Sequence, residues 1–216
     1  MKTIVLGEPL YKQVYDNLKN SIINGKLKSG QKIIVSELAE NLNISRTPVR
    51  EAVRQLEKES LIVNEQNDLI VTKINEKEFE YLYMARILNE KEAMKNIVDN
   101  ITNKQLKKIK VILQEIDVLL QQEKYEEIIE KNSDFHDEIL EANPNKFLTG
   151  IIKKLRTLLF IYRANILKTP EYMKEIKEEH NRIYQALLFK NKDMCVRIME
   201  KHLENDIKRG KQIFKK

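Results

Sequence analysis

The fold of the N-terminal part of the chain is decided by residues 36–57, which read SELAENLNISRTPVREAVRQLE. Ser36 stands where a side chain can cap a short helix over residues 37–42. The sequence then breaks, and Thr47-Pro48 is typical of an N-cap followed by proline at the first helical position. A second helix should run from there to about Glu59. Two short helices joined by a tight turn indicate a helix-turn-helix.

The second of these helices carries Arg46, Arg50 and Arg54 at intervals of four residues. They share one helical face, opposite the apolar face that would pack inward. An arginine fork can bind a guanine edge with two hydrogen bonds or clamp a phosphate. A solvated basic stripe is the alternative interpretation of three arginines alone. The short helix before them and the hairpin predicted after them favour DNA binding.

Hydroxyl groups near the two helix starts add candidate contacts to the DNA backbone. The Thr47 hydroxyl and the amides at the start of the second helix can meet a phosphate. Ser45, directly before the arginines, and Ser36, at the start of the first helix, are included as candidate DNA-binding residues. The predicted DNA-binding set therefore joins three arginines to three hydroxyl residues.

The flanking segments complete a small domain. Apolar residues recur every four positions from Leu10 to Ile22, which predicts a helix that stops near Gly25. Two β-prone runs, residues 61–63 and 69–72, enclose turn chemistry at Asn67-Asp68 and predict a hairpin. Three helices and a hairpin describe a winged helix-turn-helix domain over residues 1–74.

This stretch resembles the GntR family of bacterial regulators. The run SRTPVREA, residues 45–52, is among the more specific signatures of that family, and the resemblance covers residues 9–74. It implies that Arg46, Thr47 and Arg50 contact DNA, while Arg54 reaches only phosphate. The hairpin tip lacks the family's usual glycine, so a strong contact by the wing is not expected. Such regulators bind two-fold symmetric sites, which implies a homodimer on a palindromic DNA operator.

The rest of the chain has the pattern of long helices only. Helix start signals recur at Asn75 with Glu78, Thr102 with Gln105, Asn143-Pro144, Thr169-Pro170 and Asn191. With a further break near residues 121–124, they predict an antiparallel bundle of about six helices over residues 75–216. The fold class is therefore mainly α, with a winged helix-turn-helix followed by a helical domain.

Composition limits the setting in which the chain works. Cys195 is the only cysteine, so no intrachain disulfide can form. The first residues lack a signal-peptide core, and no apolar run is long enough to span a membrane. We expect a cytoplasmic protein with no membrane partner. The net charge of +6 says little about nucleic acid by itself, so the local arrangement of arginines carries that inference.

The chain has three histidines, His136, His180 and His202, and each lies on an apolar stripe of a predicted helix. One such histidine is usually a core residue with a hydrogen-bond partner. Three on three helices suggest instead a shared metal, which would give all three imidazoles a partner. Asn132 lies one turn before His136 and could supply an oxygen. Three nitrogens and one oxygen suit Zn²⁺ or Ni²⁺.

The same segments resemble the FCD effector domain of the FadR-like GntR subgroup, over residues 76–214. The resemblance rests on Asn132-x-x-Phe135-His136, Glu179-His180-x-x-Ile183-x-x-Ala186 and His202-Leu203. It implies a metal held by three histidines and a carboxylate, and Asn132 stands where that carboxylate is usually an aspartate.

The subgroup's effectors are often small carboxylates, which implies a cationic anchor. Arg86 is placed to be that anchor, and a buried ion pair with Glu90 is its alternative role. Arg163, on a later helix, is a further candidate.

These features favour a ligand-responsive transcription regulator, in which a small carboxylate, a metal, or both change the affinity for DNA. A regulator that senses the metal itself is one alternative. A three-histidine metal hydrolase is another, but the sequence has no His-Glu-x-x-His motif and the arginine helix would then have no role. The chain is therefore not expected to be an enzyme.

Overall fold

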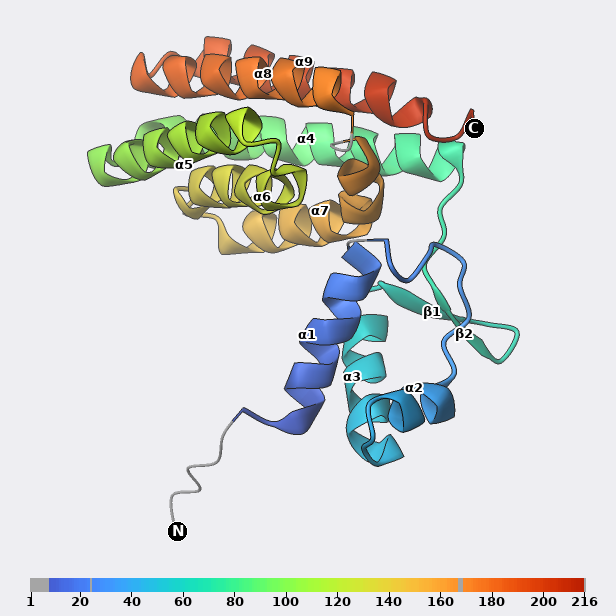
Figure 1. The fold of residues 1–216 in the computed structure, drawn as a ribbon. Helices are drawn as coiled ribbons and strands as arrows, with labels where there is room; N and C mark the ends of the chain where they lie inside the picture. The colour runs from blue at the N-terminus through green and yellow to red at the C-terminus, as the bar shows by residue number, and fades with distance from the viewer. Residues whose placement is uncertain (1–7, 24, 167–168, 216) are drawn as a thin grey trace. The chain divides into compact units, whose positions relative to one another are not determined.

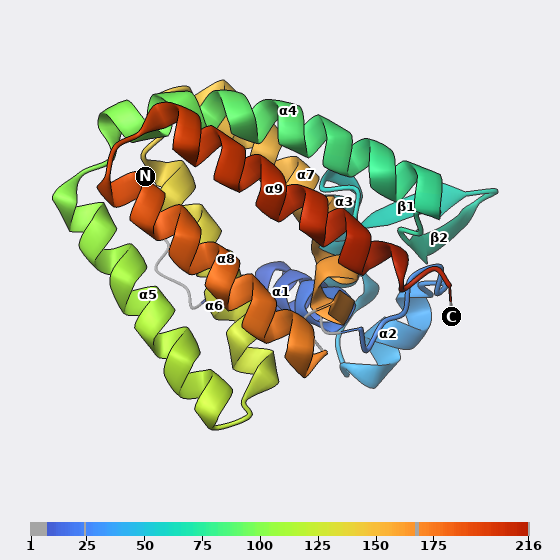
Figure 2. The same ribbon diagram turned by 90° about the horizontal axis from the view of Figure 1, so that it is seen from above.

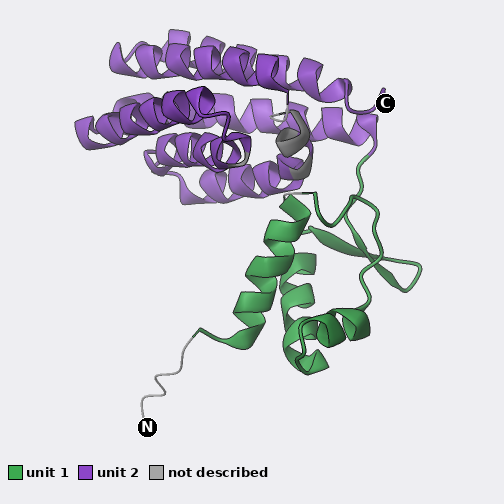
Figure 3. Cartoon of the chain, in the orientation of Figure 1, with its two compact units in different colours: residues 1–74 green, residues 75–216 purple. Residues whose placement is uncertain are grey.

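The computed structural model describes residues 8–23, 25–166 and 169–215. The chain divides into two compact units, Met1–Ile74 and Asn75–Lys216, coloured separately in Figure 3. Both are mainly helical, and the strands of the first unit form a small two-stranded sheet. Within the described ranges, none of the helices combines the length and the apolar composition that crossing a membrane requires.

The first unit has the winged helix-turn-helix architecture that the sequence predicts. Its elements in chain order are α1 (Leu10–Ile23), α2 (Val35–Asn41), α3 (Arg46–Lys58), β1 (Ile62–Glu65) and β2 (Asp68–Val71), as Figure 1 shows. The strands are antiparallel, with Ile62 opposite Val71. Helix α1 packs on α3 through the predicted apolar faces, since Leu18 and Leu56 are buried.

Two predicted helix caps are each wrong by two residues. Helix α2 begins at Val35, so Ser36 lies inside its first turn and makes no cap. Helix α3 begins at Arg46, and Ser45 takes the N-cap position without a side-chain cap hydrogen bond. Thr47 and Pro48 are thus the second and third helical residues. Proline is tolerated there because amides of the first turn have no acceptor within the helix.

The hairpin turn also differs from the prediction. Its tip is Gln66-Asn67, not Asn67-Asp68, and both tip residues have positive φ angles, 51° and 69°. That pair of left-handed residues defines a type I′ turn, which matches the twist of an antiparallel hairpin. Asp68 instead starts β2 and forms an ion pair with Lys32, 2.6 Å between Oδ1 and Nζ.

The second unit contains the predicted six helices within its described residues. They are α4 (Glu76–Asn100), α5 (Asn103–Gln121), α6 (Tyr125–Glu141), α7 (Lys146–Ile166), α8 (Pro170–Leu188) and α9 (Lys192–Lys211). The capping boxes at Asn75 and Thr102 are present, and the Asn191 side chain caps α9. The start of α7 lies two residues beyond Asn143-Pro144, because Oδ1 of Asn145 accepts from the Leu148 amide.

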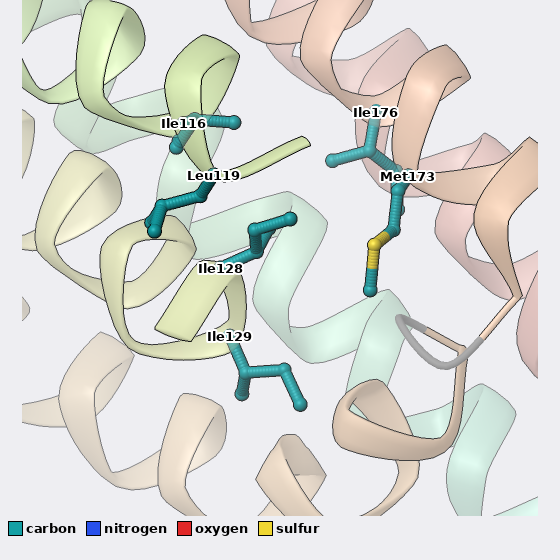
Figure 4. Close-up of a cluster of buried hydrophobic side chains, with 6 residues drawn as sticks. All are labelled: Ile116, Leu119, Ile128, Ile129, Met173 and Ile176. Atoms are coloured by element: carbon teal, nitrogen blue, oxygen red, sulfur yellow. The ribbon is translucent and has the colours of Figure 1, made fainter. Parts of the chain in front are cut away.

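The six helices contact one another in the ring order α4, α9, α8, α5, α6 and α7, and α7 closes on α4. Figure 2 shows α4, α9, α8 and α5 side by side. One part of the interior is an apolar cluster from α5, α6 and α8 (Figure 4). It comprises Ile116, Leu119, Ile128, Ile129, Met173 and Ile176. This packing fixes the backbones of helices that also carry the polar interior residues described below.

Helices α4 and α9 approach closely at Gly210. A Cβ atom on that residue would overlap the ring of Phe79, which is fully buried on α4. A glycine inside a helix costs roughly 1 kcal/mol relative to alanine. Here the missing side chain makes room for an aromatic ring, so the glycine is explained by packing.

Candidate nucleic-acid interface and metal centre

The outer face of α3 presents the arginines that the sequence singles out. Arg46, Arg50 and Arg54 are exposed, whereas Val49 and Val53 on the opposite face are buried. Within the described ranges, no hydrogen bond or ion pair ties any of the three guanidinium groups to the protein. An exposed row of cations that the protein itself does not neutralise can meet the phosphates and base edges of a DNA groove.

The three hydroxyl residues expected to contact DNA differ in their distance from this face along the chain and in their exposure. Ser45 and Thr47 are exposed at the start of α3, next to Arg46. Because Ser45 makes no side-chain cap hydrogen bond, the first amides of α3 have no side-chain acceptor from that residue. Ser36 is only half exposed and lies on α2. The structure therefore groups Ser45 and Thr47 with the arginines of α3 and leaves Ser36 on the neighbouring helix.

The three histidines converge inside the helical unit. His136 comes from α6, His180 from α8 and His202 from α9, and each is at most 3% exposed. One ring nitrogen from each lies within 4.8 Å of the others. The ring of Phe135 stacks on His180, with 4.1 Å between centroids. The three histidines considered as shared metal ligands thus lie together in the structure.

A buried carboxylate holds one of these imidazoles. Nδ1 of His202 lies 2.7 Å from Oε2 of Glu179. The other oxygen of this carboxylate, Oε1, accepts hydrogen bonds from Asn205 and from Nη1 of Arg209, and Oε2 also accepts one from Nη2 of Arg209. Burial by itself raises the pKa of Glu179. The hydrogen bonds from His202 and Arg209 outweigh that effect and lower the pKa to about 2. Glu179 is therefore an anion near neutral pH, and it fixes the ring orientation of His202.

The same network continues away from the histidines. Nη2 of Arg209 lies 2.8 Å from Oδ1 of Asp206, and Nη1 of Arg86 lies 3.9 Å from Oδ2 of Asp206. Nε of Arg86 donates to Glu90 at 2.5 Å. Burial lowers the pKa of Arg86, but the nearby Glu90, Tyr83 and Asp206 raise this pKa by more than burial lowers it. The guanidinium therefore stays charged. The ion pair between Arg86 and Glu90, which was the alternative role expected for Arg86, is present in the structure.

The imidazole nitrogens of this cluster are atoms that bind divalent metals, and the distances between them are close to those in a metal site. Nε2 of His202 has no hydrogen-bond partner in the described part of the chain, and its other nitrogen is held by Glu179. A tetrahedral zinc with bonds of about 2.1 Å would place its nitrogen ligands about 3.4 Å apart, so small side-chain adjustments suffice. Asn132 is 3% exposed and lies one helical turn before His136. Its amide oxygen would be a neutral ligand.

A small cavity of about 10 Å³ adjoins the cluster. His136, Glu90 and Arg156 are among its lining residues, and the space is that of roughly one water molecule. Arg156 of α7 is buried and donates to Asp137 at 2.6 Å. Arg163, the other predicted anchor, lies in α7, but its side chain is outside the described residues. Arg156 is thus a buried cation of α7 that lines the cavity.

Four residues of this site were given no role from the sequence: Glu179, Asp206, Arg209 and Arg156. Glu179 belongs to the motif on which the FCD resemblance rests. For two others helical spacing is the available signal, since Asp206 lies one turn after His202 and Arg209 nearly one turn after Asp206. That signal is weak, because one third of the chain is charged and most such residues are solvated.

Known families match both units. Residues 10–68 match the family described as bacterial regulatory proteins, gntR family, and residues 81–205 match the FCD domain family. The HTH-type transcriptional regulator YdhC of Bacillus subtilis is 28% identical over 208 residues, covering 95% of this chain and 93% of YdhC. The gluconate operon transcriptional repressor of Bacillus subtilis is 26% identical over 194 residues, covering 88% and 79%.

The fold also matches solved structures. The structure of McbR/YncC of Escherichia coli superposes with a TM-score of 0.82 at 24% sequence identity, covering 96% of this chain and 100% of that one. A winged helix-turn-helix with an exposed arginine face, joined to a helical domain, defines a DNA-binding transcription regulator. The chain belongs to the GntR family of bacterial regulators and carries an FCD domain. The family and the relatives are transcription regulators, so the metal hydrolase hypothesis is wrong.

Proposed function

We propose that this regulator binds a palindromic operator as a homodimer and that a small carboxylate, together with a divalent metal in the helical unit, changes its affinity for DNA. The observation that carries the DNA-binding part is the exposed, unpaired row Arg46, Arg50 and Arg54 on α3. Arg46, Arg50 and Thr47 contact the operator most closely in this proposal. The remaining candidates lie around that contact and reach only the DNA backbone in this proposal; they are Arg54, Ser45 and Ser36.

The experiment on the DNA side compares Arg50→Ala with Arg182→Ala, both exposed arginines outside the apolar core. The probe is a DNA fragment that the wild-type protein selects from a random-sequence pool. Arg50→Ala should lose about 10- to 100-fold in specific affinity, since a bidentate contact to a base is worth about 1–3 kcal/mol. Arg182→Ala should bind like the wild type. Full specific affinity in Arg50→Ala would contradict the assignment of α3 as the reading helix.

On the effector side, His136, His180 and His202 would hold the metal, and Asn132 would add an amide oxygen. The metal would supply a positive centre that can bind a carboxylate. The burial of all four residues and the hydrogen bond that orients His202 support this site. Metal analysis of protein purified without a histidine tag tests it. His136→Ala should bind less zinc or nickel than the wild type, and an equal metal content would contradict the site.

The carboxylate effector is supported by two buried cations. Arg156 lines the cavity beside His136, and Arg86 pairs with Glu90, another residue of that lining. The cavity holds about one water molecule, so a carboxylate would bind an expanded arrangement of the helices. A ligand that binds one arrangement better than another shifts the population toward it, which would couple the effector to DNA affinity. Arg163 remains a further candidate anchor on α7.

The relative that represses a gluconate operon makes gluconate a suitable first probe. Gluconate should raise the melting temperature of the protein and change its affinity for the selected DNA. Glucose, which has no carboxylate, is the matched control. If no compound in a panel of small carboxylates shifts either quantity in the zinc-loaded protein, the carboxylate part of the proposal fails. A response of DNA affinity to zinc or nickel alone would identify a metal-sensing regulator, the second candidate function.

A further inference from the structure

The outward face of α4 carries an apolar stripe, although this helix forms part of the bundle's interior on its other side. Tyr81 is 56% exposed, Met84 57% and Leu88 71%. They lie three and four residues apart, on one helical face opposite the buried Phe79 and Arg86. Large apolar residues aligned on a helix face and flanked by charges are typical of a surface that packs against another helix.

The charges on this stripe suit a second copy of the same helix. In an antiparallel pair related by a two-fold axis between Met84 and Ala85, each residue faces the one equally far beyond the axis. Tyr81 then faces Leu88 of the other copy, and Lys77 faces Glu92. Lys77 and Glu92 are exposed, and Glu92 otherwise pairs with Lys95 on the surface of the same helix, 2.7 Å between Oε2 and Nζ. In a symmetric pair, apolar side chains therefore face apolar side chains and each cation faces an anion. The two-fold axis makes each of these contacts occur twice.

The exposed apolar residues of α5 and α7 lack this self-complementarity. Phe147 and Ile151 are 89% and 50% exposed on α7, but that helix contains lysines and arginines and has no acidic residue. Pairing α7 with its own copy would bring like charges together. Val111 and Val118 on α5 are each 50% exposed, and the exposed positions around them are dominated by lysine and glutamine. Of these three helix faces, the α4 stripe is the one that fits a two-fold partner.

We propose that two copies of this chain dimerise through α4, with the two-fold axis between Met84 and Ala85, Tyr81 packed on Leu88 and Lys77 paired with Glu92 across the interface. This proposal rests on the homodimer proposed above and specifies its surface. Because apolar side chains at the centre of an interface contribute most of the affinity, Leu88 is the residue whose replacement should weaken the dimer most.

The first test measures molar mass by light scattering over a range of concentrations. The full-length wild type should be a dimer. Leu88→Glu should raise the dimer dissociation constant by at least about 30-fold, the effect of losing one central contact. Val118→Glu, an equally drastic change at an exposed valine of α5, should leave the dimer intact. Circular dichroism checks that both variants keep the helical content of the wild type.

The second test reverses charges. Lys77→Glu and Glu92→Lys should each weaken the dimer several-fold, and the double variant should restore it, because the pairing is then re-formed with opposite polarity. A double variant that adds the two defects would overturn the register. In a third test, Met84→Cys should form a disulfide between copies under mild oxidation, whereas Val118→Cys should not. The native Cys195 is buried and does not compete.

The outcomes separate the two levels of the proposal. A wild type that stays monomeric at all concentrations would overturn the homodimer itself. A wild-type dimer that is unaffected by Leu88→Glu would overturn only the α4 interface and leave the homodimer standing.

Discussion

Nδ1 of His202 lies 2.7 Å from Oε2 of Glu179, and this contact joins α9 to α8 beside the histidine cluster. Since Glu179 is an anion with a pKa of about 2, it accepts the hydrogen bond, and Nδ1 is the nitrogen that carries the proton. In the neutral form of this imidazole, Nε2 then has a lone pair that a metal can bind. The orientation of the imidazole is set by the protein before any ion arrives.

Glu179→Gln should lower the affinity for zinc by about 10- to 100-fold, the usual effect of removing the hydrogen-bond partner of a ligating histidine. The amide keeps the size of the side chain but no longer fixes the tautomer with a negative charge. Isothermal titration of the untagged protein with zinc measures the change. Glu178→Gln is the control, because Glu178 is exposed and pairs only with Arg182 in the described structure. Unchanged zinc affinity in Glu179→Gln would show that Glu179 does not prepare His202 for a metal.

Asn132→Asp should raise the affinity for zinc by at least about tenfold. The change replaces a neutral amide oxygen by a carboxylate of the same size, and a negative ligand attracts a divalent ion far more strongly in a buried site. Asp134→Asn is the matched reverse change on the same helix, at an exposed position. It should leave zinc binding as it is. Equal affinities for wild type and Asn132→Asp would place the Asn132 side chain away from the ion.

Arg54→Ala should weaken DNA binding without changing which sequence is preferred. If Arg54 contacts only phosphate, its loss should reduce the slope of log affinity against log salt concentration by about 0.9. Arg50→Ala should instead relax the preference at one or two base pairs. Fluorescence anisotropy with the selected DNA and with single-base variants of it, at several salt concentrations, distinguishes the two. A changed sequence preference in Arg54→Ala would show that Arg54 also reads bases.

Cys195 should make stability fall at alkaline pH. Burial raises the pKa of its thiol to about 11 from an ordinary value of 9.0. The folded chain therefore holds the proton over a pH range in which the unfolded chain releases it. The contribution of this thiol to the free energy of unfolding is fully present below about pH 9. As the pH rises toward 11, the free energy of unfolding falls by about 2 to 3 kcal/mol.

Urea unfolding at several pH values measures this effect by comparison with Cys195→Ala. The variant should lack that part of the pH dependence, although its overall stability will differ because a buried atom is removed. Identical slopes of stability against pH for the two proteins would show that the thiol does not contribute.

Most of the fold could be predicted from local sequence patterns. The four-residue spacing of Leu10 to Ile22 and the Asn75–Glu78 capping box each act within one helix, so they indicate its position without knowledge of the rest. The start of α2 could not be predicted in this way. The amide of Ile33 donates to the carbonyl of Leu69 in the hairpin, and α2 begins directly after that contact. A distant strand, rather than Ser36, sets the helix boundary.

The candidate metal centre was predictable only in part. His136, His180 and His202 stood out because histidine is scarce in this chain and each lies on an apolar stripe. Glu179 and Arg209 belong to residue types that occur throughout the surface, and their role depends on how α8 packs on α9. Sequence spacing shows which residues share a helix face, but the partner of a buried charge on another helix appears only in the folded chain.

The contact between Gly210 and Phe79 has a consequence for the evolution of such chains. Because a side chain at position 210 would occupy the space of the aromatic ring, the two positions cannot vary independently. Relatives that carry alanine or serine at position 210 should carry a smaller residue at position 79, or a wider separation of the two helices. We therefore expect a pair of co-varying columns that links the beginning of the helical domain to its end.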